Sequence, residues 1–217
     1  MELPFRLELR CDQMSEIEAS LWVPSAPPRA QPNAASRFIR QTLVFRHSRK
    51  TGRDLGELWP PGAQWLAASP ETISLLFAAD RRRHRGFQGF LDRGWLGMFL
   101  AREEEWIAYS WATPPGSGSP PHLPRWVGEL GAYWIFYCHT KQQFRGNGVY
   151  RRLLAQMVAR LNERKPSAIY ADVLVENLAS QRAMLASGFD RDGEMTTYNL
   201  WIPRVKSVVL GGRWSHE

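Results

Sequence analysis

The sequence predicts a mixed α/β fold in which a central sheet is flanked by helices. Segment 133–138 is continuously apolar or aromatic, which suits a strand buried on both faces. Apolar residues recur at helical spacing in 149–163, with polar residues on the opposite side. A second apolar segment, 168–175, follows, and a right-handed crossover through the helix would place it parallel to the first strand.

The segments before this unit predict a strand, a helix and a hairpin, in that order. The β-favouring run 38–45 is a candidate strand. Ser69 begins a predicted helix that runs through an apolar stretch and carries the basic run 81–85 near its end. There, positive charge is favourable by about 0.3–1 kcal/mol. Two aromatic segments, 95–101 and 106–111, lie on either side of a short polar run and predict the hairpin.

The remaining segments predict loops and one further strand. The Pro-rich and Ala-rich stretch 24–35 and the stretch 113–124, which is rich in Pro, Gly and Ser, are typical of loops. Segment 198–202 would form a last strand. We expect a single domain over 36–217, preceded by a poorly predictable segment, 1–35.

A glycine-containing loop lies between the strand 133–138 and the helix. From Gln143 to Tyr150 it reads Gln-Phe-Arg-Gly-Asn-Gly-Val-Tyr. Gly146 and Gly148 allow the backbone to turn tightly and to approach a ligand closely. The helix that follows directs its unpaired N–H groups and its positive dipole end at the same place. The loop is therefore predicted to hold the pyrophosphate of an anionic cofactor, with a glycine turn used for packing as the alternative.

A second motif covers residues 176–189. Asn177 is a good N-cap for a helix, and Gly188 suits the left-handed position beyond its end. With the loop, this motif resembles the GNAT superfamily of acyl-CoA-dependent N-acyltransferases. The Q/R-x-x-G-x-G/A signature of that superfamily is matched from Gln143 to Gly148. The pattern N-x-x-S followed by G-F is matched at Asn177, Ser180, Gly188 and Phe189.

The resemblance implies a fold and a cofactor. In that superfamily the parallel central strands splay apart where acetyl-CoA enters, and pantetheine pairs with the backbone of the strand before the loop. A second frame of the signature, starting at Arg145, places Tyr150 where a small residue usually stands. The expected cofactor-binding residues are Cys138, His139, Thr140, Gln143, Arg145, Gly146, Asn147, Gly148, Val149, Tyr150, Asn177 and Ser180.

The implied reaction is direct transfer of an acetyl group from acetyl-CoA to a primary amine. The amine must be neutral to attack, and His139 is a candidate base because histidine titrates near pH 7. Strand alternation equally permits Tyr137 or Cys138 to face the reaction centre in its place. The departing thiolate needs a proton, yet Met184 replaces the tyrosine that often donates it in the superfamily.

With Met184 in place of the tyrosine, two ways for the thiolate to leave stay open. Another hydroxyl, Tyr150 or Ser180, donates the proton, or the thiolate leaves unassisted because its pKa is about 8.5. Tyr150 is the candidate acid, and packing against the first turn of the helix is the alternative role for it.

Composition excludes several classes of protein. The chain has a net charge of +7 and a pI of about 9.8, but no nucleic-acid-binding motif accompanies this charge. The basic run 81–85 is either a solvated helix end or a site that attracts an anionic substrate or the cofactor. Cys11 and Cys138 lack the spacing of a metal site or a disulfide framework. No apolar run suggests a membrane span and the start does not resemble a signal peptide, so a cytoplasmic location is expected.

The predicted function is therefore an N-acetyltransferase that acts on a small amine, such as an amino sugar or another metabolite. Acetylation of a protein or peptide is an alternative. A regulatory domain that binds acyl-CoA without turnover is another, because Met184 removes the usual acid. Nucleic-acid binding ranks last, and the acceptor and the oligomeric state, a homodimer included, stay open.

Overall fold

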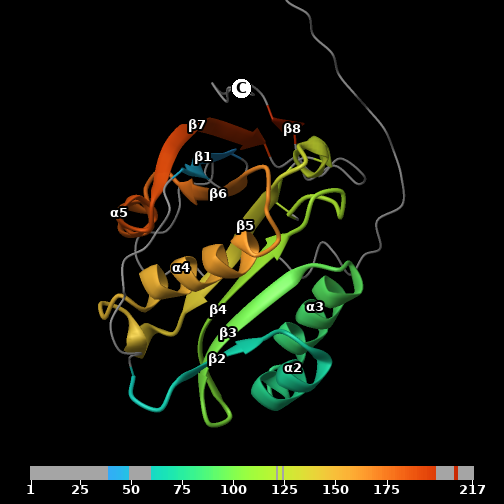
Figure 1. Ribbon diagram of the computed structural model, residues 1–217, viewed down its shortest axis with the longest axis vertical. Coiled ribbons are helices and arrows are strands. Elements are labelled where there is room, and N and C mark those ends of the chain that lie inside the picture. The colour runs from blue at the N-terminus through green and yellow to red at the C-terminus, as the bar shows by residue number, and fades with distance from the viewer. Residues whose placement is uncertain (1–38, 49–59, 121, 124, 199–207, 210–217) are drawn as a thin grey trace, which may run out of the picture.

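The computed structural model describes residues 39–48, 60–120, 122–123, 125–198 and 208–209. Predictions for 1–35 and for 199–202 fall outside these residues. The described strands form one sheet, in the order β2-β3-β4-β5-β6-β1-β7-β8 (Figure 1). Their bounds are β1 Ile39–His47, β2 Gln64–Ala67, β3 Leu96–Arg102, β4 Glu105–Thr113, β5 Tyr133–Thr140, β6 Ile169–Leu174, β7 Phe189–Tyr198 and β8 Val208–Val209.

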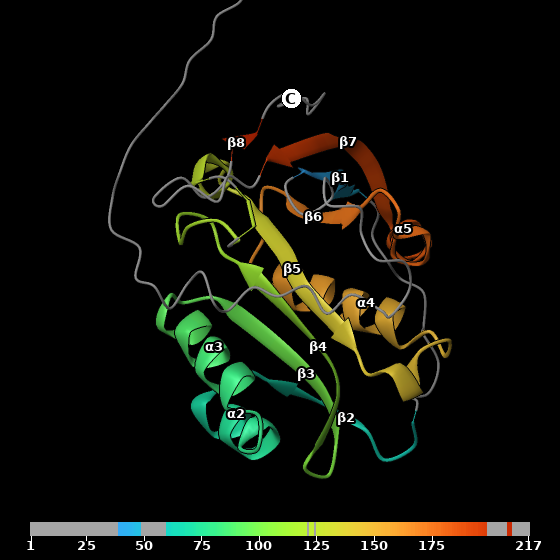
Figure 2. The same cartoon turned by 180° about the vertical axis from the view of Figure 1, so that it is seen from behind.

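Four described α-helices cover the two faces of this sheet, which confirms the predicted mixed α/β class. They are α2 Pro70–Phe77, α3 Arg81–Asp92, α4 Val149–Asn162 and α5 Leu178–Ala186. Helix α4 lies in front of the sheet in Figure 1, whereas α2 and α3 lie in front of it in Figure 2, which shows the opposite side. Two short 3₁₀ helices, Arg125–Glu129 and Gln142–Phe144, precede and follow β5.

Each face of the sheet has its own apolar layer. The layer under α2 and α3 is aromatic, and it is built on Phe77, Phe87, Phe90, Trp111 and their neighbours. The layer under α4 is mainly aliphatic. Helix α4 contributes its buried residues at the predicted helical spacing: Val149, Leu153, Leu154, Met157, Val158 and Leu161. The apolar residues of the amphipathic pattern thus form the face that this helix buries.

The basic run does not end a helix, so that prediction is wrong. Helix α2 ends at Phe77, and Asp80 caps a second helix, α3. The Asp80 carboxylate accepts a hydrogen bond from the backbone N–H of Arg83 at 3.0 Å, as an N-cap does. Arg81 to Arg85 consequently lie at a helix N-terminus, where positive charge is unfavourable.

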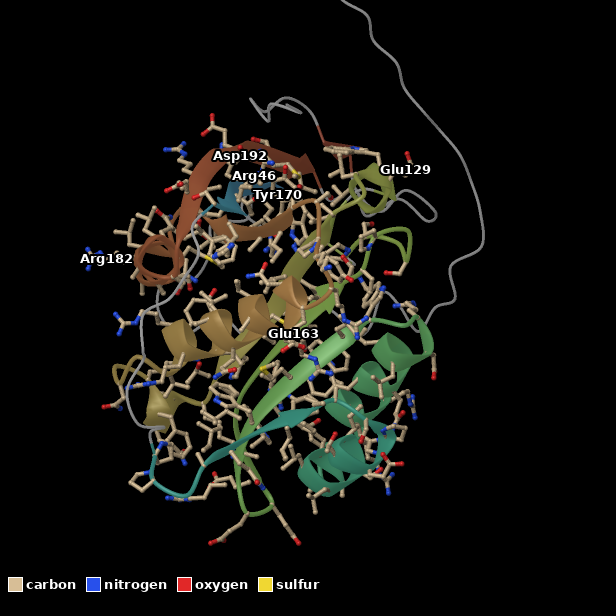
Figure 3. The ribbon with its side chains drawn as sticks, viewed as in Figure 1. Arg46, Glu129, Glu163, Tyr170, Arg182 and Asp192 are labelled. Carbon is tan, nitrogen blue, oxygen red and sulfur yellow. The ribbon has the colours of Figure 1, made fainter. Side chains whose placement is uncertain are left out.

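The N-terminal strand takes a position that sequence reasoning did not predict. β1 pairs antiparallel with both β6 and β7, so it separates two strands that are near neighbours in the sequence. Arg46 of β1 lies over the ring of Tyr170 of β6, with its guanidinium carbon 6.0 Å from the ring centroid (Figure 3). Tyr170 in turn stacks on Trp134 of β5. These contacts bind the two halves of the sheet together.

The hairpin and the second motif form as predicted. β3 and β4 pair antiparallel from Leu96 to Arg102, with a two-residue turn that begins at Glu103. Asn177 caps α5, and its side chain accepts a hydrogen bond from the Ser180 N–H at 3.1 Å. Gly188 has a φ of 84°, the left-handed conformation expected beyond the helix. The short strand β2 and the long strand β7 were not predicted.

Candidate functional site

The two central strands of the sheet part from each other. β5 and β6 are parallel and pair at three positions, ending at Ile135 and Ala171. Within these two fully described strands, no pairing joins them beyond that point, while β5 continues beside β4 as far as Thr140. The strands therefore splay, and the backbone of β5 that faces β6 is free to pair with a ligand.

A β-bulge lies in β5 just after this fork. Phe136 pairs with Trp111 and His139 pairs with Tyr109, so Tyr137 and Cys138 together lie opposite Ser110. Tyr137 has a φ of 50°, a conformation that stores local strain in a residue other than glycine. Bulges with such strain are common beside active sites.

Tyr137 and His139 lie on one face of the sheet, and Cys138 lies on the other. Tyr137 packs against Phe87 and Phe90 of α3, with ring centroids 6.0 and 5.9 Å apart. His139 stacks on Tyr109 on the same face. Cys138 points to the opposite face, where its sulfur lies 3.2 Å from the Ser110 hydroxyl. The sequence left Tyr137, Cys138 and His139 as alternatives, and the structure places Tyr137 and His139 together on the face of α3.

The glycine loop adopts the conformation that its sequence predicts. Gly146 and Gly148 both have positive φ, 84° and 69°, and Gly148 is the N-cap of α4. Arg145 Nε donates a hydrogen bond to the Thr140 carbonyl at 3.0 Å, and Arg152 donates one to the Asn147 carbonyl at 2.9 Å. These bonds hold the loop beside the end of β5.

The loop leaves its N–H groups available. Among the described residues, no carbonyl accepts a hydrogen bond from the backbone N–H groups of 146–151. They lie at the N-terminus of α4, where the helix dipole favours an anion. This arrangement fits a diphosphate.

The Thr140 hydroxyl is a further sign of a ligand beside β5. Its oxygen is buried and has no hydrogen-bond partner within the described part of the chain. A buried hydroxyl without a partner costs about 1–3 kcal/mol. A ligand that reaches the end of β5 could supply the missing bond, which supports the expected role of Thr140.

The other expected cofactor residues have different environments. The Gln143 side chain is exposed and points to Glu105, at 3.5 Å, and the Asn147 amide donates to the Arg145 carbonyl at 3.2 Å. Val149 is buried in the core, so it can contribute its backbone N–H alone. Asn177 is occupied as the cap of α5.

Tyr150, Ser180 and Cys138 meet between α4, α5 and β5. The Tyr150 hydroxyl has hydrogen-bonding contacts with the side chains of both Ser180 and Cys138. Burial, together with the neighbouring Cys138, raises the pKa of Tyr150 well above its usual value. Burial also raises the pKa of the Cys138 thiol to about 12, so this cysteine is not a nucleophile at neutral pH. Met184 is 1% exposed and belongs to the core.

His139 lies in an aromatic and cationic environment. Its ring stacks on Tyr109 and is 5.6 Å from the Trp106 ring. Burial, and then the charges of Arg83 and Arg145, lower the pKa of His139 to about 4. The imidazole is therefore neutral at pH 7, and the same environment makes it a weak base because it disfavours the protonated ring.

A buried charge cluster, which sequence reasoning missed, lies at the fork of the splay. Asp172 is the first residue of β6 beyond its pairing with β5, and its side chain is 2% exposed. The carboxylate accepts hydrogen bonds from His122 at 2.9 Å and from the Trp134 indole at 3.0 Å, and Arg40 lies 3.5 Å away. Burial alone would raise the pKa of Asp172, but these partners lower it well below its usual value. An aspartate within the apolar run 168–175 was the signal available in the sequence.

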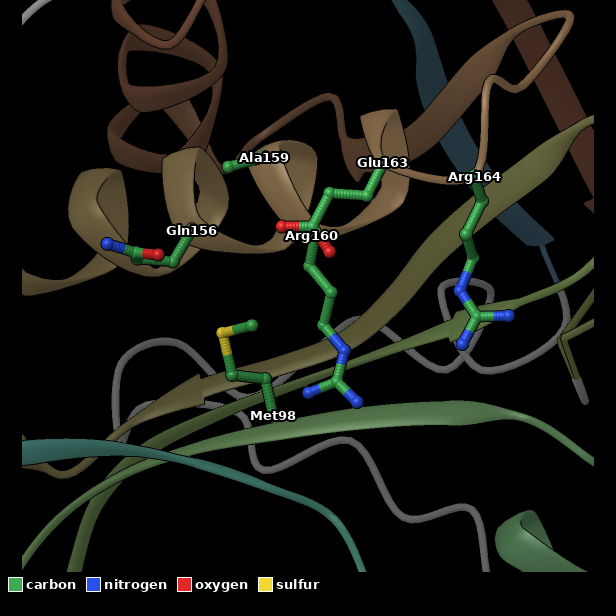
Figure 4. A pocket seen from close by; sticks show the side chains of 6 residues that line it. All are labelled: Met98, Gln156, Ala159, Arg160, Glu163 and Arg164. Atoms are coloured by element: carbon green, nitrogen blue, oxygen red, sulfur yellow. The ribbon is translucent and has the colours of Figure 1, made fainter.

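An open hollow of about 400 Å³ lies away from this site, between the C-terminal half of α4 and β3 (Figure 4). Its lining side chains are Met98, Gln156, Ala159, Arg160, Glu163 and Arg164. The hollow lies at the C-terminal half of α4, whereas the glycine loop lies at the N-terminus of this helix, so we do not assign the hollow to the candidate site.

Two further findings bear on the class of protein. The described residues contain no group of three or more His, Cys, Asp or Glu side chains that could hold a metal ion. Among the described helices, none is both long and apolar enough to cross a membrane.

Splayed parallel strands and a glycine loop with available N–H groups are the features that the resemblance to the GNAT superfamily predicts. The acetyltransferase (GNAT) family model matches residues 59–189, which is more than half of the sequence. The chain belongs to this family.

Solved structures agree with this fold. The chain is similar to an acetyltransferase of the GNAT family from Colwellia psychrerythraea, with 13% identity and a TM-score of 0.50 over 70% of this chain and 53% of that one. It is also similar to a Drosophila protein, with 15% identity and a TM-score of 0.51 over 79% of this chain and 56% of that one. The chain thus spans about half the length of both structures. At these identities the likeness shows the fold alone, and no curated protein matches the chain.

Proposed function

We propose that this chain transfers an acetyl group directly from acetyl-CoA to a primary amine of a small molecule. The observation that carries the proposal is that three features suited to a ligand follow one another along β5 and the loop after it. The β6-facing edge of β5 is open, the strand ends at the unsatisfied hydroxyl of Thr140, and the loop then presents free N–H groups. The GNAT family uses acetyl-CoA, whose pantetheine and diphosphate match these features in order.

Residues of the loop and of β5 would hold the cofactor. The N–H groups of Gly146, Asn147, Gly148 and Val149 would bind the diphosphate, and Arg145 adds a positive charge beside them. The backbone of Cys138, His139 and Thr140 would pair with pantetheine. When bound, the cofactor supplies an activated thioester.

The acceptor must lose a proton before it can attack. For an alkylammonium with a pKa of about 10.4, this costs roughly 4 to 5 kcal/mol at neutral pH. His139 is neutral in the folded protein and shares a face of β5 with Tyr137, so we propose it as the first proton acceptor. Its lowered pKa makes it a weak base that passes the proton on to water. Tyr137, with its strained backbone, would orient the amine.

Tyr150 is proposed as the proton donor in place of the tyrosine that Met184 replaces. Its raised pKa keeps the hydroxyl protonated, as a general acid requires. Ser180 and Cys138 contact the same hydroxyl and would hold it in place.

A single domain over 36–217, a cytoplasmic location and a homodimer stay predictions.

Binding and turnover can be tested in sequence on the full chain. Calorimetry would first compare acetyl-CoA, free CoA and adenosine diphosphate. We expect micromolar binding of both CoA compounds and weaker binding of adenosine diphosphate, which lacks pantetheine. Release of free thiol in the presence of a panel of amines, with the product mass raised by one acetyl group, would then establish the transfer. Absence of acetyl-CoA binding by the intact protein would contradict the proposal, and binding without thiol release for any amine would favour the non-catalytic alternative.

A further inference from the structure

Five residues form a cationic aromatic cluster beside β5: Arg83, Trp106, Tyr109, His139 and Lys141. Lys141 Nζ lies 4.6 Å from the centroid of the Trp106 ring, and the guanidinium carbon of Arg83 lies 5.2 Å from it. Arg83 Nε also donates a hydrogen bond to the Tyr109 hydroxyl at 3.3 Å. The cluster therefore brings two cations, one from α3 and one from the segment after β5, to the aromatic surface that holds His139.

Positive charge exceeds negative charge at this place. The Asp80 carboxylate forms an ion pair with Arg83, and Glu105 forms one with Lys141 at 2.7 Å. Arg145 also acts on His139, but the proposed function gives its charge to the cofactor diphosphate. The surplus of positive charge therefore comes from Arg81 and Arg85, which lie near Arg83 on α3 and form no ion pair with a carboxylate of the described residues. A negative charge brought by a ligand would offset this surplus.

The position of the arginines on α3 supports this reading. Arg81, Arg82 and Arg83 occupy the first turn of the helix, Arg85 follows, and that turn contains no acidic residue. A helix N-terminus is the least favourable place for cations because the helix dipole has its positive end there. Helix stability therefore does not explain the run, whereas attraction of an anion does.

The cluster lies on the acceptor side of the sheet. Tyr137 and His139 face α3, whereas Cys138, Tyr150 and helix α4 lie on the opposite face. A cofactor held by the loop before α4 would present its thioester within the splay, so an amine must approach from the side of α3. The cationic aromatic cluster is thus on the path of the acceptor.

We propose that the acceptor carries a carboxylate close to its primary amine and that the cationic aromatic cluster binds this carboxylate, with Arg83 as its main partner. This inference rests on the proposed acetyl transfer. The same cations repel an ammonium group, so they favour the neutral form of the amine that attacks. They also disfavour acceptors with several amines and no acidic group.

Three compounds with the same chain length test the charge preference: β-alanine, β-alaninamide and trimethylenediamine. Their end groups are a carboxylate, a neutral amide and a second ammonium. We expect kcat/KM to be highest for β-alanine, by about tenfold over the amide, which is the effect of one charge-assisted hydrogen bond. The diamine should be poorer than the amide. Titration of each compound into the CoA-bound protein should give the same order of binding.

Variants then link the preference to the cluster. Arg83→Gln should bring the ratio of β-alanine to β-alaninamide close to one, mainly through KM, and Arg83→Lys should keep most of the ratio. Arg160→Gln is the matched control, because Arg160 belongs to the hollow beside α4 (Figure 4) and should keep the full ratio. Acetyl-CoA binding, measured on every variant, reports whether the fold and the cofactor site are intact.

The outcomes separate the two proposals. Loss of acetyl-CoA binding by the wild-type protein would remove the proposed function itself. With that binding intact, an amide or diamine that equals or exceeds β-alanine, or no discrimination among the three compounds in turnover and in binding, would overturn the carboxylate proposal alone. A preference for β-alanine that survives Arg83→Gln would likewise overturn the assignment to the cluster.

Discussion

The imidazole ring of His139 is stacked on the phenol ring of Tyr109, with centroids 5.5 Å apart and ring planes at 19°. Tyr109 is 2% exposed, and its hydroxyl accepts a hydrogen bond from Arg83. A core residue of β4 thus fixes the orientation of the proposed base, and the same residue ties that base to the start of α3. This stacking connects the chemistry of the site to the charge of the helix that faces it.

The first prediction concerns the titration of His139. Its folded pKa of about 4 lies below the unfolded value of about 6.5, because burial and the charges of Arg83 and Arg145 disfavour the protonated ring. The unfolded chain therefore binds a proton first as the pH falls. Above pH 6.5 the ring is neutral in both states, and its titration does not lower the free energy of unfolding. As the pH falls from about 6.5 to about 4, proton uptake by the unfolded chain lowers the free energy of unfolding by about 1–2 kcal/mol, once partial exposure is allowed for.

Equilibrium unfolding across this pH range, with the pKa of His139 measured by NMR, checks the prediction. His47 and His122 also have lowered pKa values and act in the same direction, so the comparison that matters is wild type against His139→Gln. The variant should show a shallower loss of stability. An identical pH dependence in the two proteins, or a His139 pKa near 6.5, would contradict the proposed environment.

The second prediction separates the fold of the glycine loop from its function. Gly146 and Gly148 have positive φ, so replacement of either by alanine should destabilise the protein by about 1–2 kcal/mol. The shifted backbone should also misdirect the N–H groups of the loop and weaken acetyl-CoA binding.

Gly116→Ala is the matched control, because Gly116 has a φ of 74° with open space around it and lies in another loop. Calorimetry should show that this control has a similar loss of stability but normal cofactor affinity. Equal affinities in all three variants would make the loop structural.

The third prediction tests Tyr150 as the proton donor. Tyr150→Phe keeps the ring, which packs against the apolar layer under α4, and removes the hydroxyl that contacts Ser180 and Cys138. Loss of a general acid typically lowers turnover by about a hundredfold or more, so kcat should fall by that order with little change in the affinity for acetyl-CoA. The measurement is the rate of thiol release. If the variant turns over at the wild-type rate, Tyr150 is a packing residue and the thiolate leaves unassisted.

The fourth prediction concerns the buried cluster at the fork of the splay. Asp172→Asn removes the buried negative charge between His122 and Arg40 and should destabilise the protein by about 3 kcal/mol, because Arg40 loses this ion pair and His122 loses its charge-assisted hydrogen bond. Glu194→Gln is the control, since Glu194 pairs with Arg191 on the exposed surface and should contribute at most about 0.5 kcal/mol. Denaturant unfolding of both variants measures the difference. Similar small losses in the two would show that the cluster does not stabilise the fork.

The local elements followed from sequence because their signals are local. The spacing of Leu153 and Met157 predicted the buried face of α4, Asn177 and Gly188 marked the ends of α5, and the glycines of the loop required left-handed backbone. Errors arose where two short-range signals competed. The apolar stretch and the basic run predict one helix, but the Asp80 carboxylate caps a second one.

By itself, the sequence determined the class of this protein, because glycine conformation, capping and periodicity act within a few residues of the chain. The tertiary structure alone decided which side chains share the site. The face of β5 that carries Tyr137 and His139 packs against α3. β1 enters between β6 and β7, and Asp172 gathers partners from three distant segments. These arrangements depend on strand register and long-range packing, which are settled only when the whole sheet assembles.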